Sequence, residues 1–204
     1  MTRRPVFQFK IILQGIEPII WRRIQISNSC SFWDLHVAIQ NAMGWTDSHL
    51  HHFEVSDPNT GNKQLMGIPA DKDENFDHEI YRALPGWNYR LKDCISNNNK
   101  MLYLYDYGDG WRHLIEYEGL HQKKPNKKYP TCLAGERACP PEDVGGIPGY
   151  FNFLEIINDK NNNERKSMLQ WVGGKYNSEK FNPKKVKFDS PGKRWKYVFE
   201  ESPE

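Results

Sequence analysis

The chain has 204 residues, and its 28 Lys and Arg against 26 Asp and Glu give a formal net charge of +2. That balance excludes a strongly polycationic or polyanionic protein, and an aromatic content of 13% excludes a disordered chain. No apolar run approaches the roughly 18 residues that cross a bilayer, and four cysteines are an ordinary number for a reducing compartment. We therefore expect a cytoplasmic protein without a membrane partner, folded as a single domain over residues 1–204.

The N-terminal segment predicts a hairpin followed by a helix. Residues 7–14 alternate apolar and polar side chains, and residues 19–26 are rich in β-branched ones, so the two runs are expected to pair as antiparallel strands. The Ser31–Asp34 stretch is a capping box, which opens a helix over residues 32–43. Gly44 then supplies the usual helix stop.

The histidines of the next segment favour structural roles. His36 is expected on the solvated face of the helix. Residues 51–56 predict a strand, on which His51 and His52 point to opposite faces, so only His49 and His51 could converge on one site. Residues 57–79 are polar and acidic, which predicts a long loop.

Residues 101–118 predict a second hairpin around the Asp109-Gly110 turn, because Asp-Gly between apolar runs favours a tight turn. Two registers are open. A two-residue turn, which we favour, places Asp106 opposite His113. A three-residue loop places Tyr105 there instead. The choice matters because a slip of one residue moves every side chain to the other face.

The C-terminal third predicts short elements. Residues 130–149 are rich in Pro and Gly and are expected to form an ordered loop without regular structure. Short helices are expected at 149–159 and 165–172, and a terminal strand near the end, where Trp195, Tyr197 and Phe199 alternate with other residues. The whole predicts an α+β fold: a curved antiparallel sheet, the capped helix on one face, and short C-terminal helices.

A candidate binding cleft lies where the loop 130–146 is expected to fold over the hairpin 101–118. Arg137 is expected to hold this loop closed by pairing with a nearby carboxylate, and Asp143 either caps the next helix or is its partner. The side chains expected to form the cleft, with Trp111 as its wall, are Tyr105, Asp106, Asp109, Trp111, His113, Arg137 and Glu142.

Several long motifs in a fixed order resemble those of the plasmid pRiA4b ORF-3-like family. They are Ile19-Ile20-Trp21-Arg22-Arg23, Met43-Gly44-Trp45, YDYGDGWRH at 105–113, CLAGERACPPEDVGG at 132–146 and Trp171-Val172-Gly173-Gly174. Members of this family include passenger proteins of bacterial insertion elements. The resemblance implies a compact α+β fold on a curved antiparallel sheet and implies no particular reaction. One departure is the stretch 161–165, where relatives often carry His and this chain has none.

Three kinds of function remain open. Cys132, Cys139 and His113 could supply three zinc ligands, with a cleft carboxylate as the fourth. The two thiols could instead pack as small apolar side chains or form a disulfide. A hydrolase with an Asp/His site is the enzymatic alternative, although the chain has no nucleophile elbow, phosphate-cradling loop or zinc-protease motif.

A nucleic-acid partner is the remaining alternative, because residues 175–196 carry eight basic side chains with aromatic residues between them. The competing interpretation is a solvated basic face that balances the acidic first half. Binding to a small ligand, a metal or a protein partner is favoured over catalysis. The candidate phosphate contacts are Lys184, Lys185, Lys187, Lys193 and Arg194.

Overall fold

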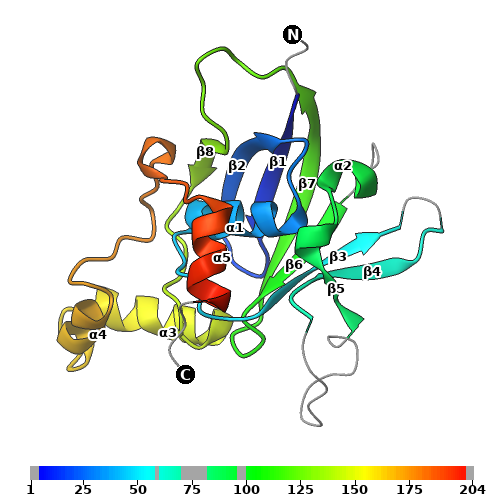
Figure 1. The fold of residues 1–204 in the computed structure, drawn as a ribbon. Helices are drawn as coiled ribbons and strands as arrows, with labels where there is room; N and C mark the ends of the chain where they lie inside the picture. The colour runs from blue at the N-terminus through cyan, green and yellow to red at the C-terminus, as the bar shows by residue number, and fades with distance from the viewer. Residues whose placement is uncertain (1–4, 58–59, 70–81, 96–99, 201–204) are drawn as a thin grey trace.

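The computed structural model describes residues 5–57, 60–69, 82–95 and 100–200, and Figure 1 shows their arrangement. The strands are β1 (Val6–Leu13), β2 (Ile20–Ser27), β3 (His51–Ser56), β4 (Lys63–Gly67), β5 (Leu84–Pro85), β6 (Lys100–Tyr105), β7 (Trp111–His121) and β8 (Thr131–Glu136). The helices are α1 (Phe32–Met43), α2 (Leu91–Cys94), α3 (Gly146–Asn158), α4 (Arg165–Trp171) and α5 (Pro191–Phe199), with 3₁₀ turns η2 (Gly86–Asn88) and η3 (Pro183–Lys185).

The described strands form one eight-stranded sheet in the order β5-β4-β3-β6-β7-β1-β2-β8. Every neighbouring pair is antiparallel except β4 and β5. The predicted α+β class and the β1–β2 hairpin are confirmed. None of the described helices is long and apolar enough to cross a membrane.

The capped helix is confirmed at residue level. The Ser31 hydroxyl accepts a hydrogen bond from the Asp34 amide at 3.2 Å, and the Asp34 carboxylate accepts one from the Ser31 amide at 2.8 Å. Gly44 ends α1 in the left-handed region, at φ 93°. The helix packs against β2 and β4 on one side and against α5 on the other, so most of its surface is buried.

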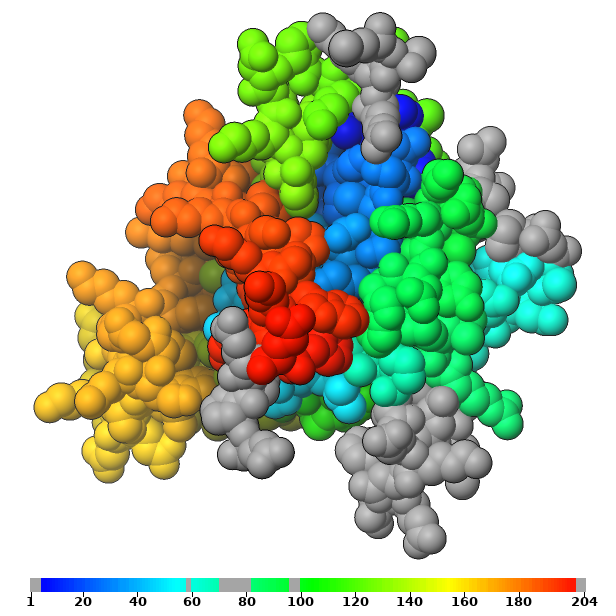
Figure 2. Space-filling view, viewed as in Figure 1, coloured from blue at the N-terminus to red at the C-terminus, as the bar shows by residue number. Residues whose placement is uncertain are grey.

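The predicted terminal strand is wrong, because residues 191–199 form α5. Trp195 and Phe199 are four residues apart, so a helix places their rings together, 4.3 Å between centroids, while Tyr197 stays 61% exposed. Both packed rings lie 5.6 Å from Trp33 of α1. Pro191 suits the first turn of a helix. Figure 2 shows the C-terminal segment, orange to red, lying across this face of the molecule.

Two predicted loops contain strands. β4 lies within the expected loop 57–79 and pairs with β3, whereas residues 70–79 lie outside the described residues. β8 lies within the expected loop 130–149 and pairs with the edge of β2, with a register shift between Arg23 and Ile24. β8 pairs with a strand that is far away in the sequence, which local composition does not report, whereas β4 forms a hairpin with the strand just before it.

Neither predicted register of the second hairpin is correct. Tyr105 pairs with Trp111 and Tyr103 with His113, so five residues, Asp106 to Gly110, form the turn. Asp106 adopts a left-handed backbone at φ 58°, and one oxygen of its carboxylate accepts hydrogen bonds from the Gly108 and Asp109 amides. This side chain-to-backbone turn takes Asp106 out of the ladder.

Candidate functional site

The loop after β8 folds over the hairpin turn, as expected. The Gly145 amide donates to the Asp109 carboxylate at 3.2 Å, and the Tyr105 hydroxyl donates to Glu142. Gly146 lies so close to the turn that a Cβ there would be 2.6 Å from the Asp109 carbonyl oxygen. The close contact requires glycine at this position.

Three side chains meet at this junction and define the His49 cluster: His49, Asp106 and Asp143. His49 Nε2 lies 2.8 Å from Asp143 Oδ1 and 3.6 Å from Asp106 Oδ2. The three candidate ligand atoms all lie within 4.8 Å of one another. The side chains are 31%, 9% and 66% exposed respectively, so the cluster opens to solvent on the Asp143 side.

Backbone geometry aims both carboxylates at the imidazole. Asp106 and Asp143 both have φ 58°, a left-handed conformation that Asp tolerates better than most residues. Because Gly108 and Asp109 amides occupy Asp106 Oδ1, its other oxygen faces His49. The second loop is held by a close approach, since a Cβ at Gly149 would lie 1.9 Å from the Val144 carbonyl oxygen.

Gly149→Ala is therefore expected to displace the Asp143–Val144 backbone and to lower the free energy of unfolding by roughly 1–2 kcal/mol. Urea unfolding followed by circular dichroism measures the change. Gly192→Ala is the matched control, because its Cβ would meet nothing closer than 3.8 Å. Equal stability of the two variants would contradict the expected clash.

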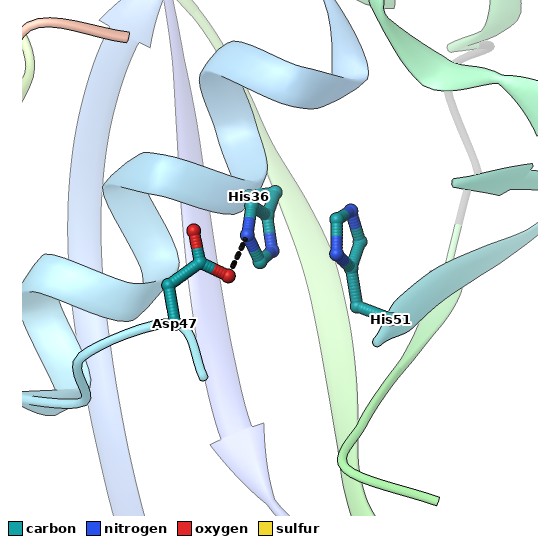
Figure 3. A group of neighbouring side chains, drawn as sticks. All are labelled: His36, Asp47 and His51. Atoms are coloured by element: carbon teal, nitrogen blue, oxygen red, sulfur yellow. Dashed lines mark hydrogen bonds and ion pairs between the residues drawn. The ribbon is translucent and has the colours of Figure 1, made fainter. Parts of the chain in front are cut away.

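A second group, the His36 cluster, consists of His36, Asp47 and His51 and is buried (Figure 3). His36 Nε2 lies 2.6 Å from Asp47 Oδ1, and the His36 and His51 rings stack at 3.4 Å with an angle of 6° between planes. The expectation that His36 is solvated is wrong, because α5 and the segment after α1 cover that helix face. Likewise, His49 and His51 belong to separate clusters.

Hydrogen bonds in the His36 cluster run in one direction. Gln40 donates to the Tyr103 hydroxyl at 2.9 Å, and that hydroxyl lies 2.8 Å from His36 Nδ1. A hydroxyl that donates to Nδ1 leaves His36 Nε2–H to donate to Asp47. Burial holds the pKa of His36 well below its usual value and raises the pKa of Asp47 to about 7. The imidazole is therefore neutral.

The stacked rings exclude joint ligation of one ion in this arrangement. An imidazole nitrogen binds a metal in its ring plane at about 2.0–2.1 Å. With His36 and His51 parallel and 3.4 Å apart, an ion in one ring plane lies far outside the other. The His49 cluster has no such stacked pair, so of the two groups it is the better candidate metal centre.

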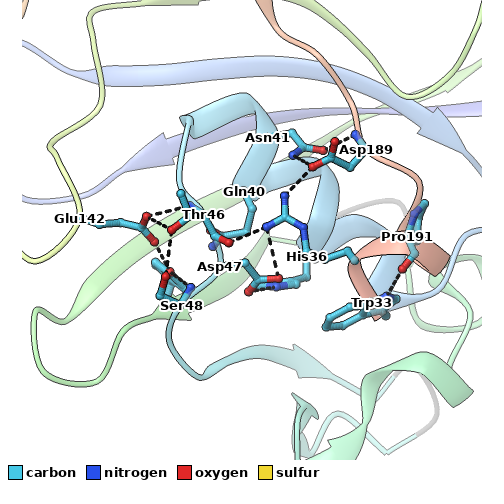
Figure 4. A network of polar contacts seen from close by, with 12 residues as sticks. Trp33, His36, Gln40, Asn41, Thr46, Asp47, Ser48, Glu142, Asp189 and Pro191 are labelled. Atoms are coloured by element: carbon cyan, nitrogen blue, oxygen red, sulfur yellow. Dashed lines mark hydrogen bonds and ion pairs between the residues drawn. The ribbon is translucent and has the colours of Figure 1, made fainter. Parts of the chain in front are cut away.

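Arg194 of α5 connects the C-terminal segment to the segment after α1, and Figure 4 shows its partners Thr46, Asp47 and Asp189 on these two segments. Its guanidinium donates to the Thr46 carbonyl at 2.7 Å and to Asp189 at 2.6 Å, and it lies 3.8 Å from Asp47. Glu142 accepts from the Thr46 amide at 2.8 Å. Residues 45–49 are thus held from both sides.

Comparison with known proteins identifies the family of this chain. The family model of the plasmid pRiA4b ORF-3-like protein matches residues 5–185. The chain belongs to this family. The uncharacterized protein y4hQ of Sinorhizobium fredii (strain NBRC 101917 / NGR234) is 33% identical over 168 residues, covering 82% of this chain and 81% of that protein.

A solved structure is also similar to this pRiA4b ORF-3-like protein. The crystal structure of the protein of unknown function MM3350 from Methanosarcina mazei Go1 superposes with a TM-score of 0.81 at 37% identity. The match covers 92% of this chain and 100% of that one. Both similar proteins are described as uncharacterized or of unknown function, so the family name brings no reaction with it.

In this pRiA4b ORF-3-like chain, the remaining predicted cleft residues are dispersed. Trp111 is 1% and His113 0% exposed, so Trp111 belongs to the core and is not a cleft wall. Arg137 pairs with Glu179 at 2.7 Å and with the Pro18 carbonyl at 3.1 Å, rather than with a carboxylate of its own loop.

The cysteines lie beside a cation. Cys132 and Cys139 are free thiols near the buried Arg22 guanidinium, and burial raises the pKa of both, that of Cys139 to about 12. Zinc binds thiolates, and burial opposes thiolate formation here while the Arg22 cation favours it. Among the described residues, the three-residue ligand groups are the His36 and His49 clusters, and neither contains these thiols or His113.

The basic segment divides between inward and outward side chains. Arg194 is 10% exposed and engaged in ion pairs, so it is not a free phosphate contact. The aromatic side chains expected to stack on bases are partly used internally: Phe181 covers Arg22 at 3.6 Å, and Trp195 packs on Trp33. All four lysines among the candidate phosphate contacts stay exposed: Lys184, Lys185, Lys187 and Lys193.

Sequence reasoning singled out Asp106 but missed its partners. The sequence pattern pairs His49 only with His51, and it gives Asp143 only the role of a helix cap or a partner of Arg137. A signal is nevertheless present in the sequence. His49 lies between the helix stop at Gly44 and the strand expected at 51–56, Asp143 lies in the expected loop 130–149, and side chains of such connecting segments can converge. Their pairing across 94 residues depends on the tertiary fold.

Proposed function

We propose that this protein binds a divalent transition cation at the His49 cluster. One observation carries the proposal: an imidazole nitrogen and two carboxylate oxygens from three separate chain segments converge within 4.8 Å. One His and two carboxylates form a donor set that suits Zn²⁺, Mn²⁺ or Fe²⁺. Zinc thus stays the candidate cofactor, with ligands different from Cys132 and Cys139.

Electrostatics support the same site. Asp106 and Asp143 both approach a single nitrogen, His49 Nε2. An imidazole has at most one N–H at this atom, and it can donate that hydrogen to only one of the two carboxylates. A dication in that position would neutralise both carboxylates while accepting the nitrogen lone pair. Three protein ligands also leave a coordination position open, which is typical of metal sites that bind or transform a ligand.

Metal titration tests the proposal. Calorimetry with Zn²⁺ and, separately, Mn²⁺ is expected to give one site per chain, and Asp106→Asn is expected to weaken binding at least tenfold because one anionic ligand is lost. Asp93→Asn, an exposed carboxylate on α2, is the matched control and should bind like the wild type. The absence of binding to the wild type, or equal binding to both variants, would refute the metal site.

A further inference from the structure

We infer that the cavity between α3 and α4 holds the apolar body of a small organic anion, whose acidic group completes the coordination of the cation; this inference rests on the proposed function. The cavity has a volume of about 400 Å³, within the range of small-molecule sites. It adjoins the His49 cluster because Asp143 belongs to both.

The walls of the cavity are largely apolar. Phe153, only 2% exposed, and Trp171, 49% exposed, both line the cavity and pack edge to face, with ring centroids 6.1 Å apart at 75°. Met168 of α4 also lines the cavity and can adapt to the shape of a ligand. Trp171 therefore offers a ligand in the cavity an apolar face that is half open to solvent.

Polar groups lie on the rim. Asp143 is 66% exposed on its side chain, and Asn152 and Ser167 also line the opening. The Ser167 hydroxyl donates to the Glu164 carbonyl, while the Asn152 amide can donate to a ligand oxygen. A ligand seated on Phe153 therefore has its polar end beside a cation ligand.

Charge decides the class of ligand. With the cation bound, the two carboxylates of the His49 cluster are balanced and the open position seeks an oxygen anion. Without the cation, the same rim is acidic and would attract an amine instead. A carboxylate and an amine with the same apolar body therefore distinguish the metal-bound mode from simple attraction to Asp143.

The experiment uses 3-phenylpropionate and 3-phenylpropylamine as probes, with full-length protein either zinc-loaded or metal-free, and calorimetry or ligand-detected NMR as readout. The acid is expected to bind the zinc-loaded protein at least tenfold more tightly than it binds the metal-free protein. It is also expected to bind the zinc-loaded protein at least tenfold more tightly than the amine does. Equal binding of the acid with and without zinc, or of acid and amine to the loaded protein, would overturn the inference.

Two variants separate the cavity from the metal. Ser167→Trp fills the cavity and should weaken the binding of 3-phenylpropionate at least tenfold. The zinc affinity of this variant, measured without the probe, should stay unchanged. Lys166→Trp, exposed on the same helix but outside the cavity lining, is the matched control and should bind both normally. Unchanged acid binding by Ser167→Trp would refute the cavity, whereas failure of zinc to bind the wild type would refute the proposed function and this inference with it.

Discussion

Arg22→Met is expected to lower the free energy of unfolding by about 2–3 kcal/mol. Arg22 is 1% exposed, and its guanidinium donates to the carbonyls of Ala42, Trp21 and Glu136 at 2.8–2.9 Å. These bonds join the end of α1 to the β2–β8 pair. Methionine fills a similar volume but removes the donor from the buried Ala42 carbonyl and from the partly buried carbonyls of Trp21 and Glu136, and the cation over Phe181 is lost.

The neighbouring arginine provides the control. Arg23 points to the other face of β2, where it pairs with Glu118 at 2.7 Å, and both side chains are partly exposed, at 31% and 23%. Exposed ion pairs contribute less than about 1 kcal/mol, so Arg23→Met should destabilise much less. Urea denaturation of both variants gives the comparison. A cost for Arg22→Met no larger than that for Arg23→Met would show that the buried carbonyls find other donors.

His113→Phe is expected to reduce the loss of unfolding free energy that the protein shows as the pH falls from 7 to 4.5. Burial lowers the pKa of His113 from 6.5 to about 4. Between pH 6.5 and pH 4 this histidine is protonated in the unfolded chain but neutral in the folded chain. It therefore lowers the free energy of unfolding as the pH falls through this range. Its contribution to the difference in unfolding free energy between pH 7 and pH 4.5 is about 2 kcal/mol. The variant should lose that difference.

The contacts of His113 with neighbouring residues make its effect on the pH dependence of stability easier to interpret than that of the His36 cluster. Its Nδ1 lies 3.3 Å from the Tyr103 carbonyl, its ring meets Trp45 edge-on, and the nearby Arg22 cation also disfavours protonation. In the His36 cluster, by contrast, the raised pKa of Asp47 and the lowered pKa of His36 change stability in opposite directions. His121→Gln, on the exposed end of β7, is the control and should keep the wild-type slope.

Local signals predicted local structure in this chain. The capping box at Ser31 and the stop at Gly44 fixed both ends of α1, because those contacts form within four residues. The alternation in β1 likewise identified its buried face. At the C-terminus the local signal was ambiguous, since Trp195 and Phe199 fit both a strand period and one helix face, and packing on Trp33 of α1 selects the helix.

The candidate site was only half predictable, because its residues are brought together by distant segments. The hairpin 101–118 and the loop that folds over it were visible in the sequence, but the turn from Asp106 to Gly110 was not. His49 and Asp143, however, meet across 94 residues. Asp106 and Asp143 both have a positive φ, which aims their carboxylates, and although Asp tolerates this conformation better than most residues, its presence at these two positions could not be read from the sequence.

The central position of β1 has a consequence for synthesis of the chain. β1 pairs with β7, where His113 lies opposite Leu13. The β1 edge of the β1–β2 hairpin therefore stays unpaired until about 100 residues after Leu13 have been made. At translation rates of about 5–20 residues per second, this takes about 5–20 s. During that interval an apolar strand edge is open to other chains. A nascent chain stalled before β7 is therefore the form of this protein most in need of a chaperone.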